Sequence, residues 1–198
     1  MDFKDFLPVV GIILGWLLSE TSSYLKGRDS SFKSTGQAIS NFYMLYMEMV
    51  QVKMAYEKYK NMTSDIKVWE HGRQRAFKEY TSKDPNFSSR LSTSIDYIAE
   101  FAPLEAFQLR EIISKYEFMK SRDLNVFLKS EKLYLSMLSG YETGFLGYQF
   151  LLEKSIRKLA QRHSVFEWLK IEIRIRAIKK YTDPKDMVFG SQVLKKKK

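Results

Sequence analysis

Apolar side chains recur every three or four positions through most of this chain. Between residues 32 and 62 the repeat includes Phe42, Leu45, Met49 and Val52, which fall on one face of a helix with 3.6 residues per turn. The pattern therefore predicts a long amphipathic helix. The same periodicity predicts further helices over residues 64–80, 91–101, 103–119 and 126–163.

Polar stretches and single residues indicate where these helices begin and end. Residues 81–89 are rich in turn-forming residues, and Ser88 or Ser89 can cap the helix that follows. Pro103 suits the first position of a helix, and Asp123 can cap the long helix after it. That long helix contains a cluster of glycines, which we expect either to interrupt or kink it or to form a close-packing face: Gly140, Gly144 and Gly147.

The last periodic segment, residues 164–181, fits two kinds of structure. Ile171, Ile173 and Ile175 alternate with charged residues, as in a β-strand. A helical stripe fits equally well, through Trp168, Ile171, Ile175 and Ile178. Because no partner strand is visible elsewhere in the sequence, we predict a helix. The fold class that follows is an all-α helical bundle.

An uncharged apolar run lies near the N-terminus, from Phe6 to Ser19. Its 14 residues cover about 21 Å as a helix, whereas a typical membrane span needs about 20 residues. The span lengthens if the helix continues through Leu25 with Glu20 facing protein or water. We predict a short N-terminal membrane helix. The alternatives are a buried core helix and a signal peptide, and the second is disfavoured because no basic segment precedes the run and no A-x-A-like site follows it.

Small side chains repeat every four residues in this predicted helix and line one of its faces: Gly11, Gly15, Ser19 and Ser23. Backbones can approach closely along such a face, so we expect the chain to form a homo-oligomer through it. Glu20 is the first acidic side chain after the apolar run. Because a lipid-facing carboxylate is costly, Glu20 either lines an aqueous pore between copies or lies at the level of the lipid headgroups.

Charged residues flank the apolar run unevenly. Lys26 and Arg28 follow it, whereas the residues before it include two acids and one lysine. The positive-inside rule then predicts a single-pass protein with the bulk of the chain in the cytoplasm. On this basis the chain divides into an N-terminal membrane helix (1–28), a cytosolic helical bundle (29–182) and a basic C-terminal tail (183–198).

Composition and charge limit the metals, cofactors and partners that the chain is expected to bind. The chain has no cysteine and two histidines, and its 33 basic and 23 acidic residues give a net charge of +10. The sequence has no cysteine metal site and no glycine-rich nucleotide motif, so we expect no metal and no cofactor. Residues 101–198 carry 20 basic and 11 acidic side chains, and this half is therefore expected to face an anionic partner. The contacts are expected from Lys154, Lys158, Arg162, Arg174 and Arg176.

One pair of residues has the chemistry of a nuclease. Arg157 and His163 are six positions apart, and an imidazole can transfer protons near neutral pH while a guanidinium holds a phosphate. The spacing resembles the R-x(4–6)-H signature of HEPN ribonucleases, all-α domains in which two such motifs meet across a dimer. Lys158 stands where that family usually has a short polar residue, which favours a non-enzymatic protein. The alternative is that both residues belong to a solvated basic face. The second histidine, His71, precedes Gly72 as at a helix end.

The order of parts resembles the membrane-anchored accessory proteins of type VI-B CRISPR systems. These parts are an N-terminal apolar helix, a basic helical body and the divergent motif at Arg157 and His163. The resemblance implies a HEPN-like, ring-shaped homo-oligomer at the bacterial inner membrane. It would permeabilise or depolarise that membrane in antiviral defence, with RNA or an RNA-guided effector as partner. Two other functions stay open, a membrane-tethered RNA-binding protein or ribonuclease and a passive membrane scaffold that holds anionic lipids.

Overall fold

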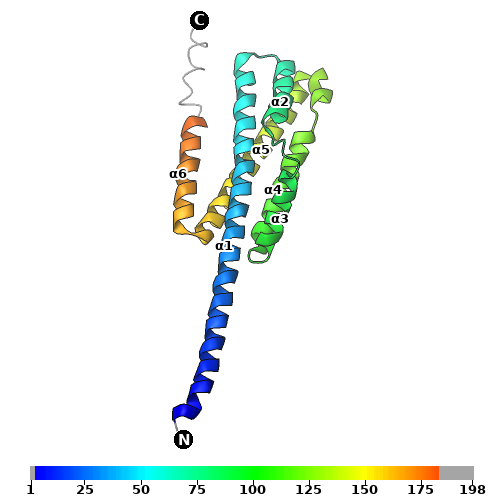
Figure 1. Cartoon of the computed structure of the whole chain (residues 1–198). Helices are drawn as coiled ribbons and strands as arrows, with labels where there is room; N and C mark the ends of the chain where they lie inside the picture. Colours follow the sequence, from blue (N-terminus) through cyan, green and yellow to red (C-terminus); the bar gives the residue numbers. More distant parts are fainter. Residues whose placement is uncertain (1–2, 183–198) are drawn as a thin grey trace.

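The computed structural model describes the backbone of residues 3–182 and the side chains of residues 32–180. Helices account for nearly all of this part of the chain, and no strand occurs within it, so the prediction of an all-α fold is confirmed (Figure 1). The elements are α1 (Phe3–Met62), α2 (Ile66–Tyr80), α3 (Phe87–Ala99), α4 (Pro103–Ser121), the short 3₁₀ helix η1 (Asn125–Lys129), α5 (Glu131–His163) and α6 (Val165–Thr182).

Helix α1 is the central element of the bundle and its longest, at 60 residues. Its C-terminal half packs against α2, α3 and α5 and buries Phe42, Leu45 and Met49 almost completely. Its N-terminal half extends beyond the bundle as a single helix (Figure 1). The polar stretch after residue 25 does not break α1, so the helix passes through the predicted boundary at residues 28 and 29. We refer to the end of the bundle from which this half emerges as the proximal end.

Helix starts follow local hydrogen bonding. Pro103 is the first residue of α4, as predicted. The prediction that Ser88 or Ser89 caps α3 is wrong, because α3 already begins at Phe87. The cause is Asp84, whose carboxylate accepts a hydrogen bond from the backbone N–H of Asn86 at 2.9 Å and so folds the preceding turn.

The segment before α5 also differs from the prediction. Asp123 accepts a hydrogen bond from the backbone N–H of Asn125 at 2.8 Å and thereby starts η1 rather than α5. Helix α5 is capped instead by Ser130, whose hydroxyl accepts from the backbone N–H of Leu133. The glycines do not interrupt α5. A Cβ at Gly144 would lie 3.1 Å from Met119 of α4, whereas Gly140 and Gly147 face open space.

Helix α6 resolves the one ambiguity in the sequence. Ile171 and Ile175 are buried against the bundle, whereas Ile173 is exposed. A strand would have placed all three on the same face, so their separation is the signature of a helix. Tyr134, Leu152 and Ile156 of α5 are fully buried members of the same hydrophobic core as Ile171 and Ile175.

Within the described part of the chain, no helix is both long and apolar enough to cross a membrane. The side chains of residues 1–31, including the apolar run at 6–19, lie outside that description. The predicted membrane helix is therefore considered below as a proposal.

Candidate functional site

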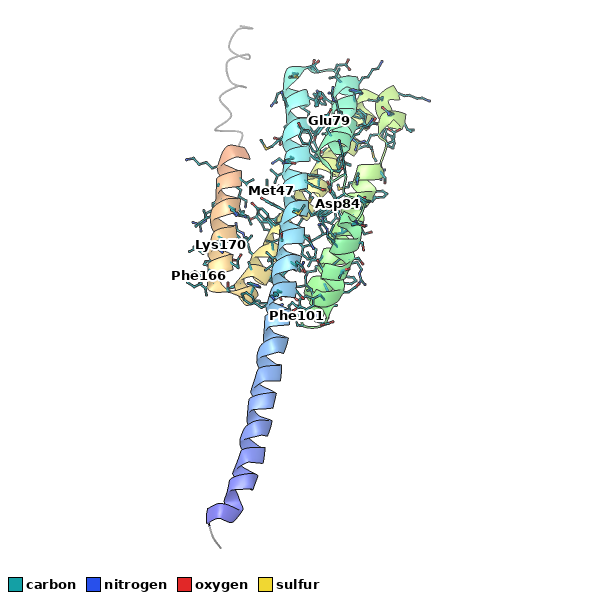
Figure 2. The ribbon with its side chains drawn as sticks, in the orientation of Figure 1. Met47, Glu79, Asp84, Phe101, Phe166 and Lys170 are labelled. Atoms are coloured by element: carbon teal, nitrogen blue, oxygen red, sulfur yellow. The ribbon has the colours of Figure 1, made fainter. Side chains whose placement is uncertain are left out.

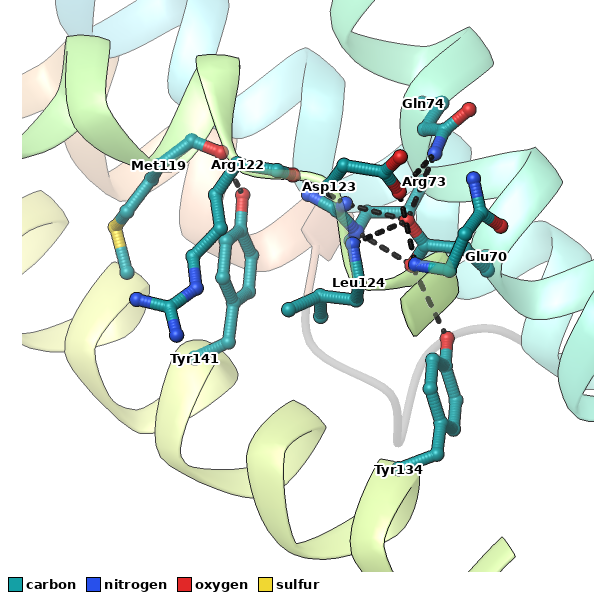
Figure 3. Close-up of polar contacts among 10 residues, drawn as sticks. Glu70, Arg73, Gln74, Met119, Arg122, Asp123, Leu124, Tyr134 and Tyr141 are labelled. Atoms are coloured by element: carbon teal, nitrogen blue, oxygen red, sulfur yellow. Dashed lines mark hydrogen bonds and ion pairs between the residues drawn. The ribbon is translucent and has the colours of Figure 1, made fainter. Parts of the chain in front are cut away.

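A buried ion pair lies between α2 and α5, where the sequence predicted no site (Figure 3). The Arg73 guanidinium donates to both carboxylate oxygens of Glu70, at 2.9 Å from Nε and 2.6 Å from Nη2. Both side chains are at most 1% exposed. Two parallel hydrogen bonds between a guanidinium and a carboxylate are the strongest arrangement that these two groups can form. Because both groups are buried in a medium of low dielectric, removal of one would leave the charge of the other uncompensated.

Four further hydrogen bonds complete this pair, and one of them comes from α2 itself, where Gln74 donates to Glu70 at 2.9 Å. The Tyr134 hydroxyl of α5 donates to Glu70 at 3.3 Å, and the backbone N–H of Leu124 donates to it at 3.2 Å. Arg73 also donates to the backbone oxygen of Arg122 at 2.7 Å. We call these residues the Glu70–Arg73 cluster. Because it ties α2 to α5 and to the connection before η1, it fixes one end of the bundle.

The tyrosines around this cluster have perturbed acidity. Burial raises the pKa of Tyr134, and the adjacent Glu70 carboxylate adds to that effect. Burial also raises the pKa of Tyr141 to about 12, although Arg73 opposes the shift. The guanidinium carbon of Arg73 lies 4.8 Å from the centre of the Tyr141 ring, a cation–π contact. Neither phenol therefore serves as an acid or a base near neutral pH.

Helix α2 can approach α1 closely because Gly72 has no side chain. A Cβ at this position would overlap the ring of Tyr59. Gly72 lies inside α2 rather than after its end, so the prediction of a helix-end histidine at His71 is wrong. His71 is exposed in the middle of the helix. One feature of the sequence could have revealed the Glu70–Arg73 cluster. The spacing of Glu70, Arg73 and Phe77 places two charged residues within the apolar stripe of α2.

The predicted residue Arg157 belongs to a second charged cluster, between α5 and α6. Its guanidinium contacts Glu153 at 3.0 Å and Glu172 at 2.8 Å. Lys179 binds Glu153 at 2.8 Å, and Arg176 binds Glu172 at 2.7 Å. We call this group the Glu153–Glu172 cluster. Its carboxylates are buried and its cations reach solvent, so Arg157 serves to join α6 to α5.

Tyr46 of α1 connects the Glu153–Glu172 cluster to the core. Its hydroxyl donates to Glu153 at 3.4 Å, and the side chain is buried. Burial raises the pKa of Tyr46, and the Glu153 carboxylate raises it further. The phenol therefore stays protonated and remains a donor to Glu153 at physiological pH.

His163, the other half of the predicted pair, is the last residue of α5 and contacts α1. Its ring centre lies 3.8 Å from that of Phe32, and Nε2 lies 3.0 Å from the Phe32 backbone oxygen. A Cβ at Gly36 would lie 3.4 Å from the same nitrogen. Arg157 and His163 thus contact different helices, and no described contact is shared between them.

The other predicted basic residues fall into three groups. Lys158 and Arg162 both approach Glu105 at the start of α4, at 3.6 Å and 3.0 Å. The positive charge next to Glu105 contributes to lowering its pKa, although a hydrogen bond from its own backbone N–H is the larger cause. Arg176 is a member of the Glu153–Glu172 cluster, and Lys154 and Arg174 are exposed. Exposed positive charge on α5 and α6 remains available to an anionic partner.

The residues of the predicted oligomer face and pore lie on the N-terminal half of α1. Their side chains are outside the described residues, and this group comprises Gly11, Gly15, Ser19, Glu20 and Ser23. Among the described residues, no group of carboxylates and histidines could hold a metal ion.

Comparison of the chain with protein-family models, curated proteins and solved structures yields no match.

Proposed function

We propose that this chain is an oligomeric bacterial membrane protein of antiviral defence. In this proposal it permeabilises or depolarises the inner membrane as an accessory to an RNA-guided effector. Residues 1–28 provide the segment that inserts into the bilayer, and residues 29–182 form a cytoplasmic bundle. The order of an apolar N-terminal helix, a basic helical body and a divergent R-x5-H pair supports this assignment.

The observation that carries the proposal is the continuity of α1. One helix begins at Phe3 and ends at Met62, and its second half is the central element of the bundle. No proline occurs in α1 after Pro8, so a change in the position of the bundle moves the rest of the apolar run as a rigid lever. A passive anchor needs no such stiffness, because a flexible linker holds a domain near a membrane equally well.

The ribonuclease alternative has weaker support. A catalytic arginine must be free to hold the phosphate of the substrate, whereas Arg157 is already bound to Glu153 and Glu172. His163 would have to leave the ring of Phe32 to reach a substrate. The passive scaffold that binds anionic lipid is the second alternative, and exposed cations such as Arg174 fit it equally well.

The experiment compares two substitutions at Gly27, which lies in α1 between the apolar run and the bundle. Proline at this position removes a backbone hydrogen bond and kinks the helix, whereas alanine strengthens it. The full chain is reconstituted into vesicles, and three quantities are measured: flotation with lipid, release of a trapped dye, and collapse of an imposed potential. We expect wild type and Gly27→Ala to float and to permeabilise. Gly27→Pro should float with the same helical content in its bundle but permeabilise several-fold more slowly.

Three results would contradict the proposal in different ways. A wild-type chain that does not float with vesicles has no membrane insertion. A chain that floats without dye release or depolarisation, at any density in the membrane, is a scaffold. Full permeabilisation by Gly27→Pro would show that the continuity of α1 has no part in the activity.

A further inference from the structure

The proximal end of the bundle exposes large apolar side chains. Figure 2 shows Phe101 and Phe166 at this end, close to the point where α1 leaves the bundle. Phe166 is 79% exposed and Leu104, at the start of α4, is 76% exposed. Phe32, Phe101 and Val165 are exposed as well. A gathering of large apolar side chains on a surface commonly marks an interaction site.

Contacts between neighbouring helices show that these side chains belong to one surface. Phe101 stacks on Tyr97, with ring centres 5.4 Å apart, and the Tyr97 hydroxyl lies 3.2 Å from that of Thr35 on α1. Arg162 reaches Glu105 at 3.0 Å, which places the start of α4 beside the end of α5. The stack of His163 on Phe32 places the α5–α6 junction against α1. We call Phe32, Phe101, Leu104, Val165 and Phe166 the proximal patch.

Positive charge surrounds the proximal patch. Lys170, one turn after Phe166, has a side chain that is 65% exposed and is labelled beside it in Figure 2. Lys33 is exposed next to Phe32, and Arg162 is about half exposed. Three carboxylates oppose them: Glu167, which binds Lys170 at 2.7 Å, Glu100 on the surface, and Glu105, which Arg162 and Lys158 largely cover. Exposed aromatic and aliphatic side chains bordered by lysine and arginine are typical of surfaces that lie in a membrane interface.

We propose that the proximal patch lies in the headgroup region of an anionic lipid leaflet and orients the bundle on the membrane. This inference rests on the proposed function, because it takes the N-terminal half of α1 to be inserted. Phe166, Val165 and Leu104 enter the headgroup region. Lys170, Arg162 and Lys33 bind lipid phosphates above them.

The length of α1 is compatible with this contact. Since α1 is helical through residue 25, the inserted segment can extend from Phe6 to Leu25, which is about 30 Å at 1.5 Å per residue. This length matches the hydrocarbon core of a bilayer. Phe32 then lies about 10 Å beyond the hydrocarbon edge, and the headgroup region occupies about 5–8 Å of that distance. Side chains that project from the proximal end can therefore enter it.

The direction of α1 favours lipid over a second copy of the chain as the occupant. The N-terminal half of α1 leaves the bundle through the proximal end (Figure 1). It projects about 43 Å from residue 31, at 1.5 Å per residue. A second bundle stacked end to end would have to make room for this helix. A bilayer that receives the helix meets the surrounding patch without obstruction.

The test uses the absence of cysteine, which allows a single label at any chosen site. Leu104→Cys and Phe166→Cys report on the proximal patch. Met62→Cys and Val126→Cys are matched controls, because both residues are highly exposed and both lie at the opposite end, next to the start of α2. Each full-length variant carries a polarity-sensitive NBD fluorophore and is reconstituted into vesicles with or without phosphatidylglycerol. Lipids with a nitroxide on the acyl chain then quench labels that reach the interface.

We expect at least twofold stronger quenching at residues 104 and 166 than at 62 and 126 in anionic vesicles, with blue-shifted emission. Lys170→Glu should reduce the quenching at residue 166 without changing flotation. Chains that float but show equal quenching at all four sites would overturn the inference and leave the proposed function intact. Blue-shifted emission that vanishes on dilution of the chains within the membrane would assign the patch to a second copy. Loss of flotation by the wild type is the separate failure of the proposed function.

Discussion

The Glu70–Arg73 cluster and the Glu153–Glu172 cluster both place carboxylates inside the bundle, but they differ in their access to water. In the first, the cation is as deeply buried as its partner, and tyrosine and backbone groups complete the hydrogen bonding. In the second, the cations reach solvent to different extents, from the Arg157 side chain at 32% exposed to the Arg176 side chain at 75%. The two clusters also join different elements, α2 to α5 in one and α5 to α6 in the other.

This difference separates a fixed part of the molecule from an adjustable one. A buried pair cannot exchange its partner without leaving a charge in a low-dielectric medium, so α2 and α5 are held in one arrangement. Exposed cations can exchange a protein carboxylate for water, salt or a phosphate at small cost. We therefore expect α6 to be the helix whose attachment responds to an anionic partner.

The largest expected effect on stability comes from breaking the Glu70–Arg73 cluster. Arg73→Met leaves the Glu70 carboxylate buried without its cation, and we expect the free energy of unfolding to fall by about 3–5 kcal/mol. The measurement is urea unfolding of the full chain in detergent, followed by circular dichroism. The double variant Glu70→Leu, Arg73→Met is the control, because it removes both charges and should recover most of the loss. A loss below about 1 kcal/mol in the single variant would contradict the comparison.

A smaller loss of unfolding free energy is expected from an arginine-to-methionine substitution in the Glu153–Glu172 cluster. In Arg157→Met, Glu153 keeps Tyr46 and Lys179, and Glu172 keeps Arg176. We expect a loss of about 2 kcal/mol, because the remaining partners and solvent compensate for part of the missing charge. Urea unfolding in low and high salt provides the measurement, and the difference from wild type should shrink at high salt. A loss as large as that of Arg73→Met would remove the distinction between the clusters.

The smallest effect is a dependence on alkaline pH. The Tyr141 phenol loses its proton near pH 10 in the unfolded chain, whereas its folded pKa is raised by burial to about 12. The stability that Tyr141 contributes is therefore full below pH 10 and is lost as the pH rises toward 12. At pH 11 we expect a loss of about 1 kcal/mol relative to pH 8 from this group. Tyr141→Phe should reduce the slope of unfolding free energy against pH, and an unchanged slope would assign the loss to other groups.

Periodicity in the sequence was sufficient to predict the helices. The repeat through Phe42, Leu45 and Met49 identifies the buried face of α1 because these side chains make the core contacts themselves. Helix boundaries were less predictable. Single hydrogen bonds that Asp84 and Ser130 accept from backbone N–H groups decide where α3 and α5 begin, and several neighbouring polar residues compete for such roles.

The charged clusters could be predicted only in part. Glu70 and Arg73 have the spacing of an ordinary surface pair, and they become buried because Tyr134 and Leu124 cover them from distant parts of the chain. Arg157 was recognised as chemically notable, but the carboxylate of Glu172 that binds it comes from the next helix. Contacts between helices, which no local sequence pattern encodes, decide both the burial of Glu70 and Arg73 and the pairing of Arg157 with Glu172.

The unbroken α1 also has a rotational consequence. Side-chain direction advances by about 100° per residue along a helix, so residues 20–31 transmit an angle as well as a distance. Rotation of the bundle about the α1 axis turns the small-residue face at Gly11 and Gly15 by the same amount. In an assembly of several copies, contacts between bundles would therefore set which face of each N-terminal helix meets its neighbour and which faces the common axis.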